Sequence, residues 1–402
     1  MFGSISFLVY ILVAIHDLKE CNSFVVSNII LSQAQRSRVV ETSYIQRTSH
    51  DTEKLILGVT NRSRRSRKKK KKKPSTPIKS DTNENPKYET ESKSKSIYSL
   101  PSLYDLAFGY RDYEQEVNFL LASHEKHSQN TDAERQLTKQ TQKSESNNKY
   151  DILELAAGPA RHSITASKLP SVKSCTAIDI SSEMIQYSNE VANEELGDLG
   201  SGGLRDKFSY ECANMKSFNI QDLSEKSLNV PSHFDCVWIL LGSLQHLTSN
   251  KDVISCFKNI SKCLNERGTL IVELPHPKEI FSMVSCTRNG WEVPLEDDEG
   301  NEYGELKVLW GDADDHFDPV RQVRDFTVAM ELSERQHDSR EKTLTSVKEV
   351  VPMRLFTAQE MEALGQLSGL ETRGQYGALE QPVVDVNDED AAFRLVCVFG
   401  KK

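Results

Sequence analysis

The chain has 402 residues, of which 37% are hydrophobic and 27% are charged, and its formal net charge is -9. A typical globular chain holds about 45–50% apolar residues, so we expect part of this one to lie outside any packed core. Residues 1–97 carry 19 Lys and Arg against 9 Asp and Glu, a net charge of +10, which leaves -19 for residues 98–402. This acidic body argues against a broad surface for binding polyanions.

Residues 5–15 form an apolar run that only Ser6 interrupts. Its length fits the roughly 7–15 apolar residues of a secretory signal and falls short of a bilayer span. Residues 24–50 then hold five Ser and three Arg with one acidic residue, which is the composition of a transit peptide. We predict a signal peptide over 1–23, a transit-like segment over 24–60 and no stable membrane anchor.

This tandem arrangement resembles the bipartite presequences of algae with complex plastids, in which an aromatic residue opens the transit segment, as Phe24 would here. The resemblance implies that the protein is imported into a plastid. The secretory pathway and the cytoplasm are the alternative destinations.

A strongly basic run follows, with ten cations among residues 62–73. Charges of one sign at this density repel one another and keep the chain unfolded. We predict a disordered linker over 61–96, and nucleic-acid binding or a nuclear address is the alternative. The eight cysteines form no CxxC pair, so the sequence predicts neither a metal site nor a disulfide framework.

Apolar residues at helical spacing begin at Ile97 and continue to Leu121, before a polar stretch over 123–149. We predict an N-terminal helical cap with a polar insertion over 97–149. Short strand-like runs then occur at 150–155, 175–180, 208–212, 234–241 and 269–274, with helical spacing at 182–193 and 251–264. Strands that alternate with helices predict a parallel sheet covered on both faces, which binds ligands beyond the carboxyl ends of its strands.

The C-terminal part of the chain changes pattern again. Alternating apolar residues and Asp/Gly-rich turns over 275–351 predict an antiparallel insertion. A helix is expected after Thr357, with Glu360 placed to complete a capping box. Strands near 370–376 and 393–399 end the chain.

A small-residue turn follows the first strand of the predicted parallel sheet and leads into a helix. It contains Glu154, Ala156, Gly158 and Ala160. Asp179 lies 21 residues beyond Gly158, at the tip of the second strand, where a carboxylate can accept two hydrogen bonds from a ribose diol. The pattern predicts a nucleoside-binding site, with Met184 placed to pack against an adenine ring.

These segments resemble the class I S-adenosylmethionine-dependent methyltransferases, from about residue 97 to the C-terminus. In that family the turn carries three glycines, whose positions here are Ala156, Gly158 and Ala160. The resemblance implies a Rossmann-like seven-stranded sheet whose last strand is antiparallel, with S-adenosyl-L-methionine as cofactor. It implies a cofactor-binding core over 150–274, a lid over 275–351 and closing elements over 352–402. The cofactor-binding residues that it implies are Arg111, Glu154, Ala156, Gly158, Pro159, Ala160, Asp179, Ile180, Met184, Asn214, Met215 and Leu241.

Few catalytic groups are expected, because methyl transfer is accelerated mainly by position and desolvation. His246, just beyond the fourth strand, and His276, just beyond the fifth, are the candidates for accepting a proton from an acceptor hydroxyl or amine. Each histidine could equally serve in packing. The resemblance implies a small-molecule acceptor, and the missing Asn/Asp-Pro-Pro-aromatic tetrad after Leu241 disfavours a nucleic-acid base. The sequence leaves the oligomeric state open.

Three other functions fit parts of the pattern. An NAD-dependent enzyme shares the turn and the acidic tip, but it would normally keep glycine where Ala156 and Ala160 stand. A non-catalytic adenosyl-binding or scaffold protein would fit the same two alanines. An RNA methyltransferase would draw its affinity from the basic residues 62–73.

Overall fold

The computed structural model describes residues 96–128, 150–278, 289–335 and 341–402, apart from Ser201, Leu228 and Asp298. The predicted signal peptide, transit-like segment and basic linker up to residue 95 lie outside these ranges, as does most of the polar insertion. The chain divides into two compact units. The smaller one holds the described parts of 294–305 and 335–341, and the larger one holds the other described residues.

Seven strands form the main sheet, in the order β11-β12-β5-β4-β1-β2-β3. Strands β1 to β5 pair in parallel, and β12 pairs antiparallel with both β5 and β11. Both features confirm the predicted Rossmann-like sheet with a reversed last strand. Strand order reverses between β1 and β4, where ligands bind in such sheets. The strands are β1 (Tyr150–Leu155), β2 (Val172–Asp179), β3 (Phe208–Cys212), β4 (Phe234–Ile239), β5 (Leu264–Pro275), β11 (Leu370–Tyr376) and β12 (Arg394–Lys401).

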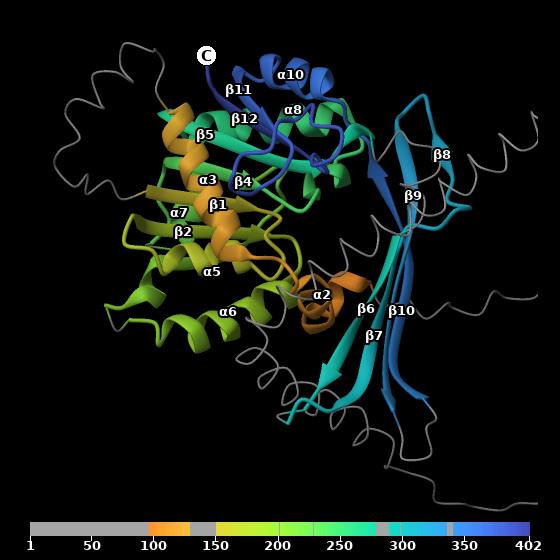
Figure 1. Cartoon of the computed structure of the whole chain (residues 1–402). Coiled ribbons are helices and arrows are strands. Elements are labelled where there is room, and N and C mark those ends of the chain that lie inside the picture. The colour runs from red at the N-terminus through yellow and green to blue at the C-terminus, as the bar shows by residue number, and fades with distance from the viewer. Residues whose placement is uncertain are drawn as a thin grey trace, which may run out of the picture. The chain divides into compact units, whose positions relative to one another are not determined.

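Helices cover both faces of this sheet, because successive side chains of its strands point to opposite faces and are apolar on both. Ile152 and Trp238 pack in one core cluster, whereas their neighbours Leu153 and Val237 pack in the other. One face carries α3 (Tyr113–His127), α5 (Arg161–Ser167) and α6 (Ser182–Leu196), and the other carries α7 (Ile220–Lys226), α8 (Asn250–Cys263) and α10 (Ala358–Gln366), as Figure 1 shows.

Side-chain caps fix where the long helices begin. Asp112, Ser181, Ser249 and Thr357 each accept a hydrogen bond from a backbone N–H in the first turn of α3, α6, α8 and α10. Such a cap is worth about 1 kcal/mol. The Thr357 cap confirms the predicted helix start, but the carboxylate of Glu360 pairs with Arg354 instead of closing a capping box.

The N-terminal cap begins with η1 (Ile97–Ser99) and α2 (Pro101–Phe108). Asp105 of α2 is buried and accepts a hydrogen bond from Arg161 Nε of α5 at 2.9 Å and one from the Tyr187 hydroxyl of α6 at 2.6 Å. A buried ion pair of this kind is costly to break, because the remaining charge loses its partner. The contacts of Asp105 therefore hold α2 against α5 and α6.

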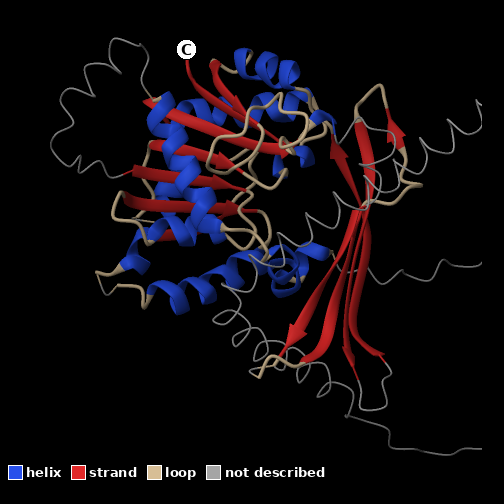
Figure 2. Cartoon of the chain, in the orientation of Figure 1, coloured by secondary structure: helices blue, strands red, loops and turns tan. Residues whose placement is uncertain are grey.

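A five-stranded second sheet follows β5, and it confirms the predicted antiparallel insertion (Figure 2). Its strands run in the order β10-β9-β7-β6, and β8 pairs with β9. The strands are β6 (Asn289–Glu296), β7 (Glu302–Trp310), β8 (Phe317–Asp318), β9 (Val323–Arg335) and β10 (Glu341–Arg354), and two short helices of the core are η2 (Leu204–Lys207) and η3 (Ser243–His246).

Two further observations complete the fold. No helix in the described ranges is long and apolar enough to cross a membrane. Of the six described cysteines five are buried, and Cys212 is exposed.

Candidate active site

A cavity of about 460 Å³ lies beyond the carboxyl ends of β1, β2, β4 and β5, and residues of η1, α2, β6 and β7 also line it. This is the edge of the sheet at which strand order reverses. The cavity brings together ten of the residues singled out in the sequence, namely Arg111, Ala156, Gly158, Asp179, Ile180, Met184, Asn214, Met215, Leu241 and His246.

The turn after β1 adopts an unusual backbone conformation at every second residue. Ala156, Gly158 and Ala160 all have φ of 52°. A residue with a Cβ pays about 1–2 kcal/mol to occupy this left-handed region, which explains why glycine suits all three positions. A Cβ at Gly158 would lie 4.0 Å from Tyr104 Cε1, so a longer side chain there would extend into the space between the turn and that ring.

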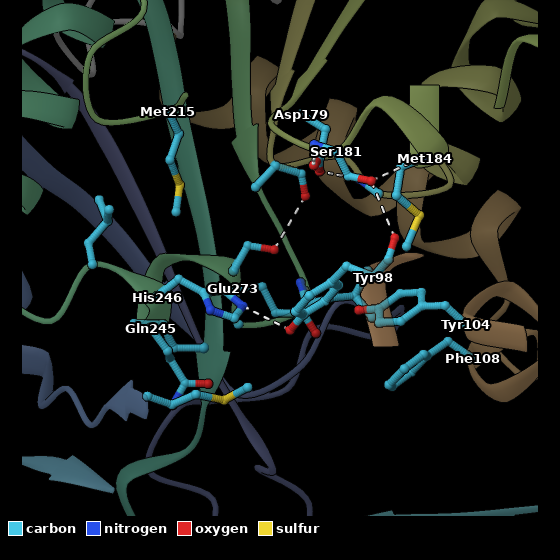
Figure 3. A pocket seen from close by; sticks show the side chains of 18 of the residues that line it. Tyr98, Tyr104, Phe108, Asp179, Ser181, Met184, Met215, Gln245, His246 and Glu273 are labelled. Atoms are coloured by element: carbon cyan, nitrogen blue, oxygen red, sulfur yellow. Dashed lines mark hydrogen bonds between the residues drawn. The ribbon is translucent and has the colours of Figure 1, made fainter. Parts of the chain in front are cut away.

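Asp179 is held at the tip of β2 by two backbone groups. Its Oδ2 accepts from the N–H of Gly158 and its Oδ1 from the N–H of Ser181, both at 2.9 Å. Each carboxylate oxygen keeps a second lone pair. Asp179 is therefore oriented by the turn itself and can still accept two hydrogen bonds from a ligand in the cavity (Figure 3).

An apolar slot adjoins Asp179. Met184 of α6 and Met215 are buried at its sides, whereas Ile180 is 68% exposed and lines the cavity. The Asn214 Oδ1 accepts from the N–H of Lys216 at 3.0 Å, and its amide group still offers N–H donors and one oxygen lone pair. The slot thus combines polarizable thioethers with one polar edge.

Four predicted site residues do not line the cavity. Glu154 is 2% exposed and accepts from the N–H and the hydroxyl of Ser163, and burial raises the pKa of its carboxyl group. It stabilises the start of α5 from below the turn, which also contains Pro159 and Ala160. His276 lies elsewhere, with Nε2 2.9 Å from the Val386 carbonyl oxygen and Nδ1 accepting from the N–H of Lys278.

A buried carboxylate at the end of β5 was not among the predicted site residues. Glu273 is 1% exposed and interacts with Arg111 at 3.1 Å, Arg394 at 3.0 Å and the N–H of Leu241 at 2.8 Å. The two guanidinium groups and the backbone donor outweigh its desolvation and lower its pKa to about 2. The cluster fixes Arg111 and holds Leu241 at φ of 53°.

His246 ends η3 and lines the cavity, as predicted from the sequence. Its Nε2 lies 3.1 Å from the hydroxyl of Tyr98, and the two rings meet edge to face. Protein atoms displace water around the imidazole and lower its pKa, so it is neutral at pH 7. The backbone carbonyl of Tyr98 also accepts from the Ser181 hydroxyl at 3.3 Å, which links η1 to the tip of β2.

Aromatic rings form one wall of the cavity. Phe108 is central to it, with ring centroids 4.7 Å from Tyr104, 5.6 Å from Trp291 and 5.4 Å from Trp310. The indole of Trp291 donates to the Ala107 carbonyl at 2.9 Å, which fixes its ring. These aromatic residues, Glu273 and Arg394 were missed in the sequence. Only Glu273, an acid inside the apolar run 270–274, carries a signal that could have been read.

Comparisons with known proteins agree with this geometry. Residues 153–272 match the family model described as a methyltransferase domain. The match confirms the resemblance to class I methyltransferases, and the chain therefore contains a methyltransferase domain. A search of curated protein sequences finds no match.

Three solved methyltransferase structures resemble this chain at low sequence identity. An S-adenosylmethionine-dependent methyltransferase from Clostridium acetobutylicum superposes with a TM-score of 0.51 at 16% identity, over 75% of this chain and 97% of that one. A sugar N-methyltransferase from a Streptoalloteichus species superposes with a TM-score of 0.46 at 13% identity, over 83% of this chain and 100% of that one. An amino pentose methyltransferase from Micromonospora echinaspora superposes with a TM-score of 0.46 at 12% identity, over 80% of this chain and 100% of that one. Only the first superposition is close enough to show a shared fold.

Proposed function

We propose that this protein is an S-adenosylmethionine-dependent methyltransferase that acts on a small molecule. The observation that carries the proposal is the position of Asp179, whose carboxylate is oriented by the N–H of Gly158 and exposes lone pairs to the cavity. A diol needs such a pair of acceptors, and the adjoining slot of Met184 and Met215 suits a flat, apolar ring.

The residues present fit this cofactor. Asp179 would hold the ribose, Asn214 offers a polar edge for adenine, and the turn with Ala156 and Gly158 has no side chain longer than a methyl group at these positions. When bound, the cofactor supplies a methyl carbon on a sulfonium, which an acceptor lone pair attacks while the electron pair of the broken carbon–sulfur bond stays on sulfur.

The other residues of the cavity would orient the acceptor and accept its proton. His246 is neutral and lies at the carboxyl end of β4, so in the tautomer whose Nε2–H donates to the Tyr98 hydroxyl its Nδ1 can accept that proton from an acceptor hydroxyl or amine. The Tyr98 hydroxyl at 3.1 Å orients the ring. No role in proton transfer is proposed for His276, because both of its ring nitrogens are already bonded outside the cavity.

The size of the cavity supports a small acceptor. Its volume of about 460 Å³ falls within the usual range for small-ligand sites of roughly 300–1,000 Å³. The acceptor shares this cavity with the cofactor. The formal charge of -19 over residues 98–402 also disfavours a polyanionic substrate.

Transfer of a labelled methyl group tests the proposal. The full chain is incubated with methyl-labelled S-adenosylmethionine and a metabolite extract, and labelled small molecules are identified by mass spectrometry. We expect a labelled product that needs the active protein. Binding of the cofactor without transfer to any acceptor would instead indicate a non-catalytic adenosyl-binding protein, and label in RNA would indicate a nucleic-acid substrate.

A further inference from the structure

Arg394 opens β12 and lines the cavity beside the end of β5, where it pairs with Pro275. Its side chain is 29% exposed, and its Nε lies 3.0 Å from Glu273 Oε1. A guanidinium group has five N–H donors, and Nε supplies one of them. Within the residues that the structure describes, the two terminal nitrogens of Arg394 make no hydrogen bond.

Glu273 does not serve as the acceptor for these remaining donors. A carboxylate offers about four lone-pair positions. Arg111 Nη2 donates to both oxygens at 3.1 Å, the N–H of Leu241 donates to Oε2 at 2.8 Å, and Arg394 Nε forms an ion pair with Oε1 at 3.0 Å. The terminal nitrogens of Arg394 are therefore available to an anionic group in the cavity, and the planar fork of Arg matches a carboxylate in particular.

The aromatic wall indicates the shape of the molecule that carries this group. Tyr104, Phe108, Trp291 and Trp310 line the cavity and contact one another ring to ring. Such rings attract either a flat apolar ring or a cation. Because Arg394 adds a positive charge at the β5 end of this cavity, a cationic acceptor beside it is disfavoured, and a planar anionic acceptor is favoured.

The position of Arg394 assigns the anion to the acceptor and not to the cofactor. Asp179 and the small-residue turn follow β2 and β1, and β4 separates β1 from β5, beside which Arg394 lies. We propose that the methyl acceptor is a planar aromatic carboxylate whose carboxylate is bound by Arg394 and whose ring packs on the wall formed by Phe108, Trp291 and Trp310. This inference rests on the proposed function and names the substrate class of that site.

Matched ligand pairs test this proposal on the full chain. The probes are 4-hydroxybenzoate, 4-hydroxycinnamate and indole-3-carboxylate, each with its neutral amide, titrated by calorimetry in the presence of saturating S-adenosylhomocysteine. At least one carboxylate should bind about tenfold or more tightly than its amide, because the guanidinium bonds to a charged group. Arg394→Gln should abolish the difference, and Arg394→Lys should retain part of it.

Three other results would overturn the proposal, and a fourth would count against the proposed function alone. Equal binding of acids and amides, or no binding of any probe to the wild type, overturns the proposal. Loss of S-adenosylhomocysteine binding in a folded Arg394→Gln variant also overturns it, because Arg394 would then serve the cofactor's own carboxylate. If the wild type does not bind S-adenosylhomocysteine, the proposed function fails separately, and the same ligand pairs titrated alone still show whether Arg394 selects a carboxylate.

Discussion

The hydroxyl of Tyr98 lies 3.1 Å from Nε2 of His246, although the two residues are 148 positions apart in the sequence. Tyr98 belongs to η1, and the Ile97 N–H beside it donates to Glu349 of β10 at 2.8 Å. His246 ends η3 at the carboxyl end of β4. The contact therefore joins the N-terminal cap to the edge of the sheet where the parallel strands end, and it places a neutral imidazole beside the cavity (Figure 3).

Replacing His246 should reduce catalysis without reducing cofactor binding. In His246→Gln the rate of methyl transfer should fall about 100-fold or more, because the group that accepts the proton is lost. The affinity for S-adenosylhomocysteine should change little, since Asp179 and the turn are intact. Full activity in the variant would show that His246 only packs against Tyr98.

The pH profile of the wild type gives a second test of the same group. The pKa of His246 is lowered, so activity should be constant through neutral pH and should fall only at acid pH, when the imidazole becomes protonated. The His246→Gln variant should lack this acid limb. The same fall in activity at acid pH in the variant would show that another residue causes it.

The left-handed backbone of the turn predicts different effects of glycine on stability at two alanines. Ala156→Gly should raise the free energy of unfolding by about 0.5–1 kcal/mol, because relief of the strained φ exceeds the entropy cost of glycine. Ala160 has the same φ but is fully buried, so its glycine variant also loses a packed methyl group worth about 0.8 kcal/mol and should be near neutral. Denaturant unfolding measures both. A destabilised Ala156→Gly variant would contradict the strain argument.

Protonation of His124 should make stability depend on pH. Burial lowers the pKa of this histidine from 6.5 to about 4, and its Nδ1 lies 3.0 Å from the Thr269 hydroxyl. Between these values the unfolded chain binds a proton that the folded chain does not, so the stability present at neutral pH is lost as pH falls from about 6.5 to 4. The expected loss between pH 7.5 and 4.5 is about 2–3 kcal/mol.

His124→Gln provides the comparison for that prediction. It cannot titrate, so its free energy of unfolding should fall less than that of the wild type over the same pH interval. Other groups, including Glu273 with its pKa of about 2, titrate alike in both proteins and cancel in the difference. Identical pH dependence in the two proteins would show that His124 does not contribute.

The leader remains a prediction from the sequence and is tested separately. Residues 1–60 fused to a fluorescent reporter should direct it to the plastid of an alga with complex plastids, because the fusion carries both the apolar run and the Ser/Arg-rich segment. A fusion that lacks residues 1–23 should stay in the cytosol. Diffuse signal from both fusions would contradict the assignment, and secretion of the first would favour a simple signal peptide.

Much of the fold could be predicted because local patterns determine it. The apolar runs 150–155 and 234–241 are buried on both sheet faces, and that produces near-continuous hydrophobic sequence. Thr357 could be recognised as an N-cap from its own neighbours. Asp179 could be predicted at the site because its role follows from its place at the end of a strand.

The rest of the site depends on contacts between distant segments, which no local pattern shows. Trp291 and Phe108 meet only because β6 and α2 line one cavity. Arg394 and Glu273 are brought together by the pairing of β12 with β5. His276 was chosen for its place after β5, but the chain turns it toward Val386, outside the cavity.

Calorimetric titration of the full chain with S-adenosylhomocysteine tests the central claim most directly. We expect binding by the wild type and by Glu194→Ala, an exposed control on α6. Asp179→Ala should bind at least tenfold more weakly, because each lost hydrogen bond to the charged carboxylate is worth about 1.5–3 kcal/mol. Absence of heat with the wild type, or equal affinity of folded Asp179→Ala, would contradict the assignment of this cavity to the cofactor.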